Sequence, residues 1–238
     1  MRRLTVHGIA ITASLVILVF NLCPDQAGAG ENTYDLNADW SDISNPNGPW
    51  SYNDYNSVPL AHNYNLDVID TWPIPQPGWT KPWLPVWFKA TTTGQDIANW
   101  YKGDWQIGDI ITHTNSSVSW TAEYDGTIDI TGSLWVTRTR EQEWFLYVDG
   151  VQVDGSILDG NLSSRTNQTY FNHTELSILA GQVVELKIAE HNYSNYGDYI
   201  GVNLTITDDY IIPEPVTMVG MIFGINAIGI SYIKRRQS

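Results

Sequence analysis

The chain has 238 residues, a formal net charge of −14 and a single cysteine. This balance disfavours nucleic-acid binding, which needs a basic surface to neutralise phosphates. Five of the 12 Lys and Arg residues lie at the two ends, so the central part, 31–212, keeps 7 of them against 24 acidic residues. Basic-flanked apolar ends around an acidic body indicate an exported chain rather than a cytosolic enzyme.

Residues 1–29 are typical of a secretory signal peptide. A basic start, Arg2-Arg3, precedes an apolar run of 13 residues over 8–20, which is too short to span a bilayer. Small residues at 27–29 predict cleavage before Gly30. Cys23 would leave with the signal, so the mature chain would have no disulfide and no thiol chemistry. An uncleaved anchor and lipid attachment at Cys23 are the alternatives.

Acidic residues near both ends of the central domain, 30–212, are candidate calcium ligands. Calcium takes about six to eight oxygen ligands, and carboxylates supply them well. The candidates are Asp35, Asp39, Asp198 and Asp208. No DxDxDG loop accompanies them, so the alternative to a structural Ca²⁺ is plain solvated charge.

A segment rich in proline and tryptophan covers 72–85, with five prolines between 73 and 85. Because proline lacks the N–H that a sheet ladder needs, we expect an extended surface loop here, partly in the polyproline II conformation. A strand is expected to resume at 86–90. The rings in or beside the loop either stack on sugars or clamp the loop onto the sheet: Trp72, Trp79, Trp83 and Trp87.

Short alternating segments fill the rest of the body. Apolar and polar residues alternate over 127–136, 144–148, 184–188 and 202–207, each pattern typical of a half-buried antiparallel strand. Asp149-Gly150 predicts a two-residue hairpin turn, since glycine tolerates a positive φ. The predicted fold is therefore all-β, an antiparallel jelly-roll-like β-sandwich formed by one domain.

Three aromatic residues are out of phase with the apolar faces of these strands: Trp135, Phe145 and Tyr147. Flat rings stack on pyranose faces and lose little rotamer entropy in doing so. We expect either carbohydrate stacking at the surface or a second buried face. Trp50, Trp120 and Trp144 are expected in the core.

No catalytic motif is present. The chain has no GxSxG, no P-loop and no Rossmann glycine pattern, and the body histidines lack zinc-ligand spacing. The many acidic pairs match no motif for glycoside hydrolysis, which needs two carboxylates at a set separation. We therefore expect a protein that is not an enzyme.

The C-terminal segment, 213–238, has three parts. Pro213-Glu214-Pro215 precedes an apolar run of 18 residues over 216–233, and Lys234-Arg235-Arg236 follows it. Such a run reaches ~27 Å as a helix, nearly the thickness of a hydrocarbon core. We expect a transmembrane helix whose basic cluster stays on the cytoplasmic side, with the body facing outward.

This end resembles the PEP-CTERM sorting signal of Gram-negative bacteria. The resemblance implies an exosortase-type membrane protease as partner, and a setting of exopolysaccharide and biofilm production. The chain would pass through an inner-membrane-anchored intermediate and then reach the cell surface or extracellular matrix. The alternative is an ordinary C-terminal anchor.

The body resembles a domain that recurs in planctomycete-type PEP-CTERM proteins. The matching motifs follow the family's order: Asp39-Trp-Ser41, Asn45-Pro-Asn-Gly-Pro-Trp-Ser-Tyr52, Val118-Ser-Trp-Thr-Ala122, Asp125-Gly-Thr-Ile-Asp-Ile-Thr-Gly132, Leu146-Tyr-Val-Asp-Gly150, Leu179-Ala-Gly181 and Gly201-Val-Asn-Leu-Thr-Ile-Thr207. The resemblance implies a sandwich similar to carbohydrate-binding modules, and it carries no established catalytic residues. We expect an exported surface or matrix protein that binds extracellular polysaccharide. A purely structural surface protein and, less favoured, a glycan-active hydrolase are the alternatives.

Overall fold

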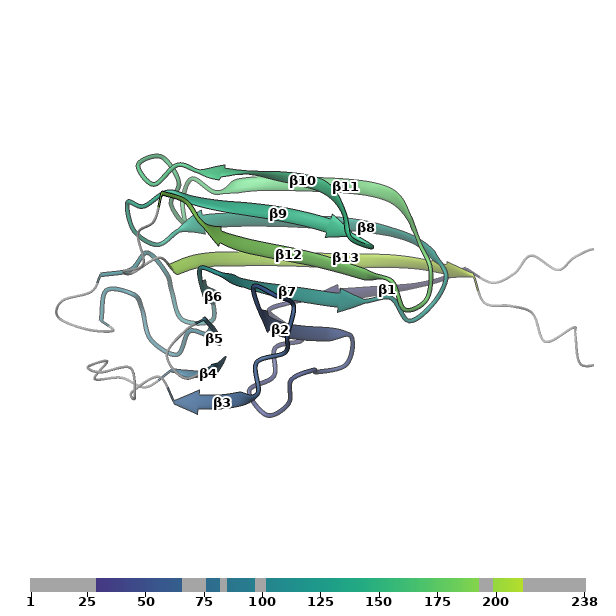
Figure 1. The fold of residues 1–238 in the computed structure, drawn as a ribbon, viewed down its shortest axis with the longest axis horizontal. Coiled ribbons are helices and arrows are strands. Elements are labelled where there is room, and N and C mark those ends of the chain that lie inside the picture. The colour runs from purple at the N-terminus through teal and green to yellow at the C-terminus, as the bar shows by residue number, and fades with distance from the viewer. Residues whose placement is uncertain (1–28, 66–75, 82–84, 97–101, 193–198, 212–238) are drawn as a thin grey trace, which may run out of the picture.

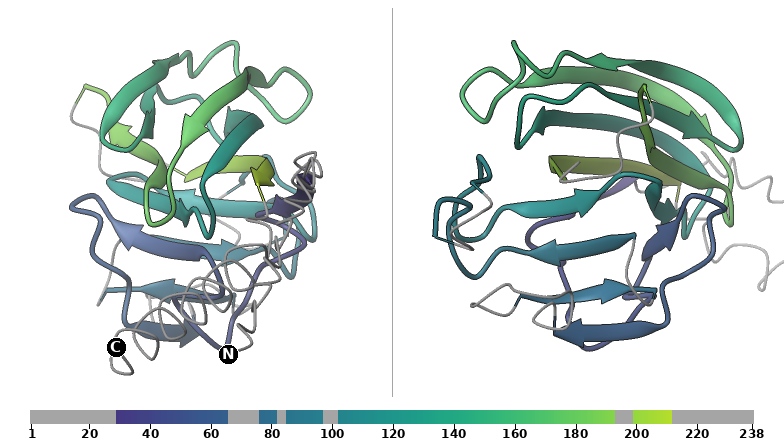
Figure 2. Two further views of the ribbon diagram at one scale, coloured as in Figure 1. Left: turned by 90° about the vertical axis from the view of Figure 1, so that its right-hand side faces the viewer. Right: turned by 60° about the vertical axis from the view of Figure 1, so that its left-hand side comes forward.

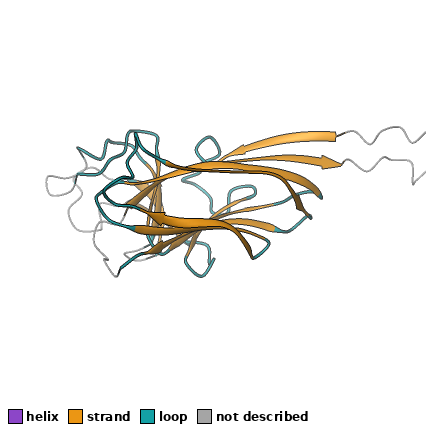
Figure 3. Ribbon diagram, turned by 90° about the horizontal axis from the view of Figure 1, so that it is seen from above, coloured by secondary structure: helices purple, strands orange, loops and turns teal. Residues whose placement is uncertain are grey.

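The computed structural model describes residues 29–65, 76–81, 85–96, 102–192 and 199–211. Every regular element in these ranges is a β-strand, and Figure 3 shows the strands in two layers. The all-β, antiparallel β-sandwich predicted from the alternating segments is confirmed. The expected signal peptide and the expected helix at 216–233 lie outside the described residues. Within the described residues, no helix is long and apolar enough to span a membrane.

One layer is an eight-stranded sheet with the order β11-β8-β13-β6-β5-β4-β3, and β1 pairs separately with β13. Figure 1 shows β13 running the length of this layer. Its strands are β1 (Ala29–Asp35), β3 (His62–Asn65), β4 (Pro77–Thr80), β5 (Val86–Lys89), β6 (Ile110–His113), β8 (Gly126–Val136), β11 (Thr169–Ile178) and β13 (Tyr199–Ile211).

The other layer is a five-stranded sheet with the order β10-β9-β12-β7-β2. Its strands are β2 (Trp50–Asp54), β7 (Ser116–Thr121), β9 (Gln142–Val148), β10 (Val151–Leu158) and β12 (Val183–Glu190). The β9–β10 hairpin turns at Asp149 (φ 48°) and Gly150 (φ 74°). Two positive φ angles are those of a type I′ turn, so the predicted turn is confirmed.

The main core lies between the inner faces of the two sheets. Alternate residues of β8 and β13, such as Ile130 and Leu204, pack there against Trp120, Trp144 and Leu186 of the other sheet. Burial of each large apolar side chain contributes about 1.5–3 kcal/mol. The apolar residues that alternate with polar ones in the sequence are thus the ones whose side chains each strand buries.

The proline-rich segment differs from its prediction. Residues 77–80 form β4, which pairs with β3 and β5 rather than running as a loop. Pro77 stands at the first position of the strand, where a missing N–H is tolerated. Gly78, Trp79 and Thr80 each have the backbone N–H and C=O that pairing with neighbouring strands requires. Strands β3, β4 and β5 extend one edge of the eight-stranded sheet, at the bottom of Figure 1 and in blue in Figure 2.

A second, smaller core lies on the outer face of the eight-stranded sheet. We call it the buried aromatic cluster, and it consists of Val86, Phe88, Ala90, Trp105, Ile111, Trp135 and Tyr199. Trp135 donates from Nε1 to the Asp104 carbonyl at 2.7 Å and lies over Gly201. The segment carrying Asp104 and Trp105 therefore covers a face that strand periodicity alone would leave open.

The two ends of the domain lie side by side. Strand β1 pairs antiparallel with β13, with Ala29 opposite Ile211 and Asp35 opposite Thr205. Both ends thus leave the sandwich at the same place, on the right of Figure 1.

Candidate functional site

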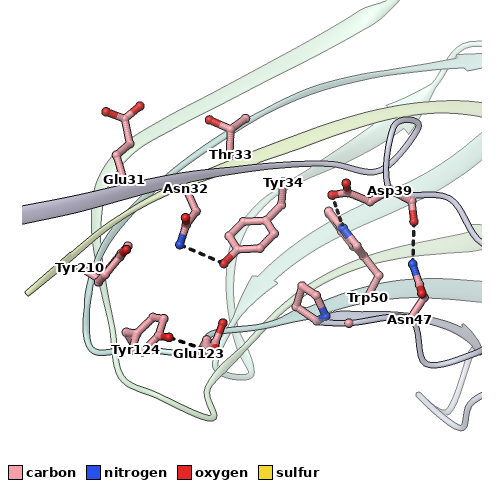
Figure 4. A pocket seen from close by; sticks show the side chains of 12 residues that line it. Glu31, Asn32, Thr33, Tyr34, Asp39, Asn47, Trp50, Glu123, Tyr124 and Tyr210 are labelled. Carbon is pink, nitrogen blue, oxygen red and sulfur yellow. Dashed lines mark hydrogen bonds between the residues drawn. The ribbon is translucent and has the colours of Figure 1, made fainter. Parts of the chain in front are cut away.

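A groove of about 710 Å³ opens at the end where β13 finishes. Five parts of the chain line it: β1, the turn after β1, the turn at 47–49 with the start of β2, the turn between β7 and β8, and the end of β13 (Figure 4). We call it the tyrosine groove, after three of its lining residues, Tyr34, Tyr124 and Tyr210. Its other lining residues are Glu31, Asn32, Thr33, Asp39, Asn47, Gly48, Pro49, Trp50 and Glu123.

Two tyrosine rings stack against each other in the groove. The rings of Tyr124 and Tyr210 lie with centroids 4.7 Å apart and an interplanar angle of 23°. Next to this pair, Gly126 lets the backbones of β8 and β13 approach closely, because a Cβ there would lie 2.1 Å from the Asp209 carbonyl oxygen. Tyr124 is 42% exposed. The pair therefore presents aromatic surface to solvent.

The third tyrosine, Tyr34, is held by a buried ring and by hydrogen bonds. The Tyr34 ring packs on buried Trp120 at 5.2 Å. Its hydroxyl donates to Asp208 Oδ2 at 3.5 Å and accepts from Asn32 Nδ2 at 3.4 Å. Asp208 also accepts the Asn32 backbone N–H at 3.0 Å. These hydrogen bonds join β1 to β13, so the position of the Tyr34 ring depends on the pairing of the two strands.

The opposite end of the groove is built around Asp39. Its Oδ2 accepts from Trp50 Nε1 at 3.1 Å and from the Asp35 backbone N–H at 3.0 Å. The Asn47 side chain donates to the Asp39 carbonyl at 2.9 Å, as Figure 4 shows. These bonds fix a rigid rim of amide and carboxylate groups.

The groove is electrostatically negative. Its described lining includes Glu31, Asp39 and Glu123 but no Lys, Arg or His. Burial, together with the charges of Asp208 and Glu123, raises the pKa of Tyr34 to about 12. The hydrogen bond to Glu123 and the charge of that group raise the pKa of Tyr124. Burial raises the pKa of the Asp208 carboxyl as well.

The expected calcium ligands do not gather at one point in the described structure. Asp35 and Asp39 are joined by a hydrogen bond, whereas Asp208 pairs with Asn32, three residues along β1 from Asp35 and so about 10 Å away. Asp198 lies outside the described residues. Among the residues described, no group of three or more His, Cys, Asp or Glu side chains is placed to hold a metal ion.

The tryptophans for which sugar stacking and packing were both left open are interior where they are described. Trp79, Trp87 and Trp135 are all at most 5% exposed, so their rings have no free face, and the stacking alternative is wrong for these three. Trp79 and Trp87 join the main core, which fits the alternative that they clamp the proline-rich segment. Trp135 belongs to the second buried face that was its alternative. Trp72 and Trp83 lie outside the described residues, as do Pro213, Glu214, Pro215, Lys234, Arg235 and Arg236 of the expected sorting signal.

Phe145 and Tyr147 are half-buried on the outer face of the five-stranded sheet. Their rings lie 6.4 Å apart, and Lys187 Nζ stands 5.7 Å from the Tyr147 centroid and 5.5 Å from that of Tyr55. Lys187 also pairs with Glu185 at 3.4 Å. This face keeps two of the predicted aromatics at the surface, but the cation and the carboxylate neutralise each other there.

A second hollow, of about 470 Å³, lies on the outer face of the eight-stranded sheet. Side chains of Thr131, Ser133, Asn203 and Thr205 surround it with Tyr170, which is 75% exposed. It carries no charged side chain.

Sequence patterns did not point to the tyrosine groove. Its three tyrosines come from positions 34, 124 and 210, and only the strand register brings them together. Two sequence signals fall on its lining, Asp39 as a candidate calcium ligand and the motif over 45–52, but neither indicated an aromatic groove.

Comparisons with known proteins give no family for this chain. No family model matches it, and no curated protein matches it. Many solved structures show a partial likeness, and three are given as examples. The second CBM51 and INT domains of ZmpB from Clostridium perfringens match at 14% identity and a TM-score of 0.33, over 42% of this chain and 22% of that one.

The CBM36-1 domain of a xylanase from the hindgut metagenome of Trinervitermes trinervoides matches at 12% identity and a TM-score of 0.32, over 68% of this chain and 99% of that one. The CBM51 of a Clostridium perfringens GH95 protein, solved with methyl-galactose, matches at 15% identity and a TM-score of 0.33, over 60% and 98%. At these scores the argument for function rests on the residues of the groove.

Proposed function

We propose that this protein is an exported β-sandwich that binds extracellular polysaccharide in the tyrosine groove. The observation that carries the proposal is the stacked pair of Tyr124 and Tyr210 beside Glu123 and Asn32. Aromatic faces suit the apolar faces of pyranose rings, and carboxylate and amide groups suit the hydroxyls around their edges. A concave surface that combines the two is the usual form of a ligand site.

We propose binding rather than hydrolysis. A glycosidase needs two carboxyl groups that face the bond to be cleaved, one of them kept protonated by a raised pKa. Among the described carboxyl groups with a shifted pKa, only that of Asp208 is raised, yet Asp208 is 4% exposed and does not line the groove. Its oxygens are also bonded to Asn32 and Tyr34.

Export and sorting complete the proposal. The signal-like start and the PEP-CTERM-like end support a chain that is carried out of the cytoplasm, anchored in the inner membrane and processed by an exosortase-type protease. The pairing of β1 with β13 places Ala29 beside Ile211, so cleavage before Gly30 and beyond Ile211 would remove only the first residue of β1 from the two sheets. The released domain would act at the cell surface or in the matrix of a Gram-negative-type bacterium.

Affinity electrophoresis of the full-length chain in a non-ionic detergent, against a panel of soluble polysaccharides, tests the binding. We expect at least one glycan to retard the protein. Tyr124→Ala should weaken that binding by about two- to ten-fold, since one stacked ring contributes about 0.5–1.5 kcal/mol. Tyr170→Ala, which removes an exposed ring at the other hollow, is the matched control and should leave binding unchanged.

Absence of retardation by every glycan, with the fold verified by circular dichroism, would favour the structural surface protein instead. A specific observation supports that second candidate: seven described tryptophans are buried and serve packing. They are Trp50, Trp79, Trp87, Trp105, Trp120, Trp135 and Trp144.

A further inference from the structure

We propose that Tyr124 and Tyr210 are a site of covalent modification, at which oxidation joins the two rings by a carbon–carbon bond to give an intramolecular dityrosine. The inference goes beyond the proposed function, because it does not require that the groove binds a glycan. It is carried by the geometry of the ring pair, by a proton acceptor beside one ring, and by the scarcity of other readily oxidised side chains in the central domain.

The two rings are already placed for coupling. Their centroids lie 4.7 Å apart at an interplanar angle of 23°, so edge carbons of one ring lie against those of the other. Of the ring contacts found between described residues, this is the one that joins two tyrosines. Tyr55 and Tyr147, in contrast, are contacted by Lys187 Nζ, 5.5 and 5.7 Å from their centroids, rather than by each other.

Both rings are positioned by the fold, and one of them is open to solvent. Tyr210 lies near the end of β13 opposite Gly30 of β1, where a Cβ would come within 2.2 Å of the tyrosine ring. Tyr124 lies in the turn between β7 and β8 and is 42% exposed. An oxidant can therefore reach Tyr124 while the half-buried partner ring stays beside it.

Glu123 can take up the proton that Tyr124 loses on oxidation. The Tyr124 hydroxyl donates to Glu123 Oε1 at 3.1 Å, as Figure 4 shows. Loss of one electron makes a phenol strongly acidic, so its proton leaves readily when a base lies within hydrogen-bond reach. An ionised carboxylate is such a base, because it has acceptor oxygens and no proton of its own.

The central domain, 30–212, has few groups that compete for an oxidant. The one Cys and the three Met residues of the chain all lie outside it, at Cys23, Met1, Met218 and Met221. Thiols and thioethers are the side chains that oxidants commonly modify. Within the domain, tyrosine and tryptophan are therefore the main targets, and seven of the described tryptophans are buried.

The step uses a one-electron oxidant, a haem peroxidase with hydrogen peroxide. Each ring loses one electron and its phenolic proton and becomes a tyrosyl radical. The two radicals form one bond between ring carbons that adjoin the oxygen-bearing carbons. The hydrogen on each bonded carbon then moves as a proton to the phenolic oxygen, which restores both aromatic rings. The pair loses two hydrogen atoms in total, and one hydrogen peroxide accepts them and becomes two waters.

The new bond would tie the end of β13 to the turn between β7 and β8. Tyr210 directly precedes Ile211, so the cross-link lies where the chain leaves the sandwich. It closes a long loop as a disulfide does, and such a loop stabilises the fold mainly by restricting the unfolded chain. We expect the midpoint of thermal unfolding to rise by roughly 5–15 °C.

Treatment of the full-length chain in non-ionic detergent with a haem peroxidase and hydrogen peroxide tests the proposal. We expect a monomer that has lost two hydrogen atoms, with dityrosine fluorescence and proteolytic fragments joined through Tyr124 and Tyr210 in the mass spectrum. The yield should not depend on protein concentration, because the bond lies within one molecule. Tyr124→Phe and Tyr210→Phe keep a flat ring without the phenol and should each abolish this product. Glu123→Gln should lower its initial rate of formation.

Tyr170 provides the matched control, because it is 75% exposed and has no tyrosine ring against it in the described structure. Tyr170→Phe should leave the intramolecular product unchanged and reduce coupling between molecules. Coupling through Tyr170 without a product that joins Tyr124 to Tyr210 would overturn the proposal. Persistence of the intramolecular product in both groove variants would do the same, as would a complete lack of dityrosine under conditions that couple free tyrosine. None of these results bears on glycan binding, which affinity electrophoresis measures separately.

Discussion

Two aromatic clusters lie at the two ends of the same strand, β13. At its start, Tyr199 joins the buried aromatic cluster, where Trp105 and Trp135 are at most 1% exposed. At its end, Tyr210 lies in the tyrosine groove with Tyr124, which is 42% exposed. The difference teaches that the rings at the start of β13 serve packing, whereas Tyr124 at its end, with a polar hydroxyl on an apolar ring, keeps part of its surface in contact with solvent.

The largest test of this contrast is removal of a ring from the buried end. Trp135→Ala should lower the free energy of unfolding by about 3–5 kcal/mol, because it leaves a cavity in packed surroundings and the Asp104 carbonyl loses its donor. Urea unfolding followed by tryptophan fluorescence measures the change. Tyr124→Ala at the exposed end is the matched variant, and we expect it to cost under about 1 kcal/mol. An equal loss of unfolding free energy in the two variants would contradict the distinction between a packed end and an exposed end of β13.

Acid should destabilise the buried end first. His113 is 5% exposed, its ring packs edge-on against Tyr199 at 4.9 Å, and burial lowers its pKa to about 4. Because the unfolded chain protonates this histidine near pH 6.5, stability is full above that pH and falls as pH drops towards 4, by about 3 kcal/mol in total.

Unfolding curves at several pH values between 4 and 7 check this expectation. His113→Phe keeps a flat ring but does not titrate, so its stability should fall less over the same window. A parallel pH dependence of the wild type and the variant would show that other groups control acid unfolding.

The smallest expected effects compare two glycines that each face a ring. A Cβ on Gly201 would lie 2.0 Å from the Trp135 indole, and a Cβ on Gly30 would lie 2.2 Å from the Tyr210 ring. Gly201→Ala should cost about 1–3 kcal/mol, because Trp135 is enclosed on all sides. Gly30→Ala should cost under about 1 kcal/mol, because the half-buried Tyr210 ring can swing outward. Thermal unfolding of both variants checks the order, and a reversed order would contradict it.

Local sequence patterns predicted the strands well and the site poorly. The alternation in 127–136 and 202–207 reports which face each strand buries, so the sandwich followed from it. The same alternation placed Trp135 correctly on the outer face of its sheet. It did not reveal that the segment with Trp105 would cover that face, because this contact joins residues about 30 positions apart.

The groove was missed for a related reason. Tyr34, Tyr124 and Tyr210 have unremarkable neighbours in the sequence, and their proximity depends on two long-range registers, β1 with β13 and β13 with β8. Tryptophan was the expected sugar-stacking residue because its ring offers the larger surface. A large apolar ring also contributes the most stability when it is buried, and the described tryptophans in question are buried.

The pairing of β1 with β13 has a consequence for the order in which the chain assembles. Asn32 and Asp208 are bonded across 176 positions, and β13 is the one partner of β1 in the described structure. During synthesis the first strand therefore cannot pair until the last strand has been made. The groove that both strands line is completed only after the whole domain has been synthesised, so a partly synthesised domain would lack the tyrosine groove.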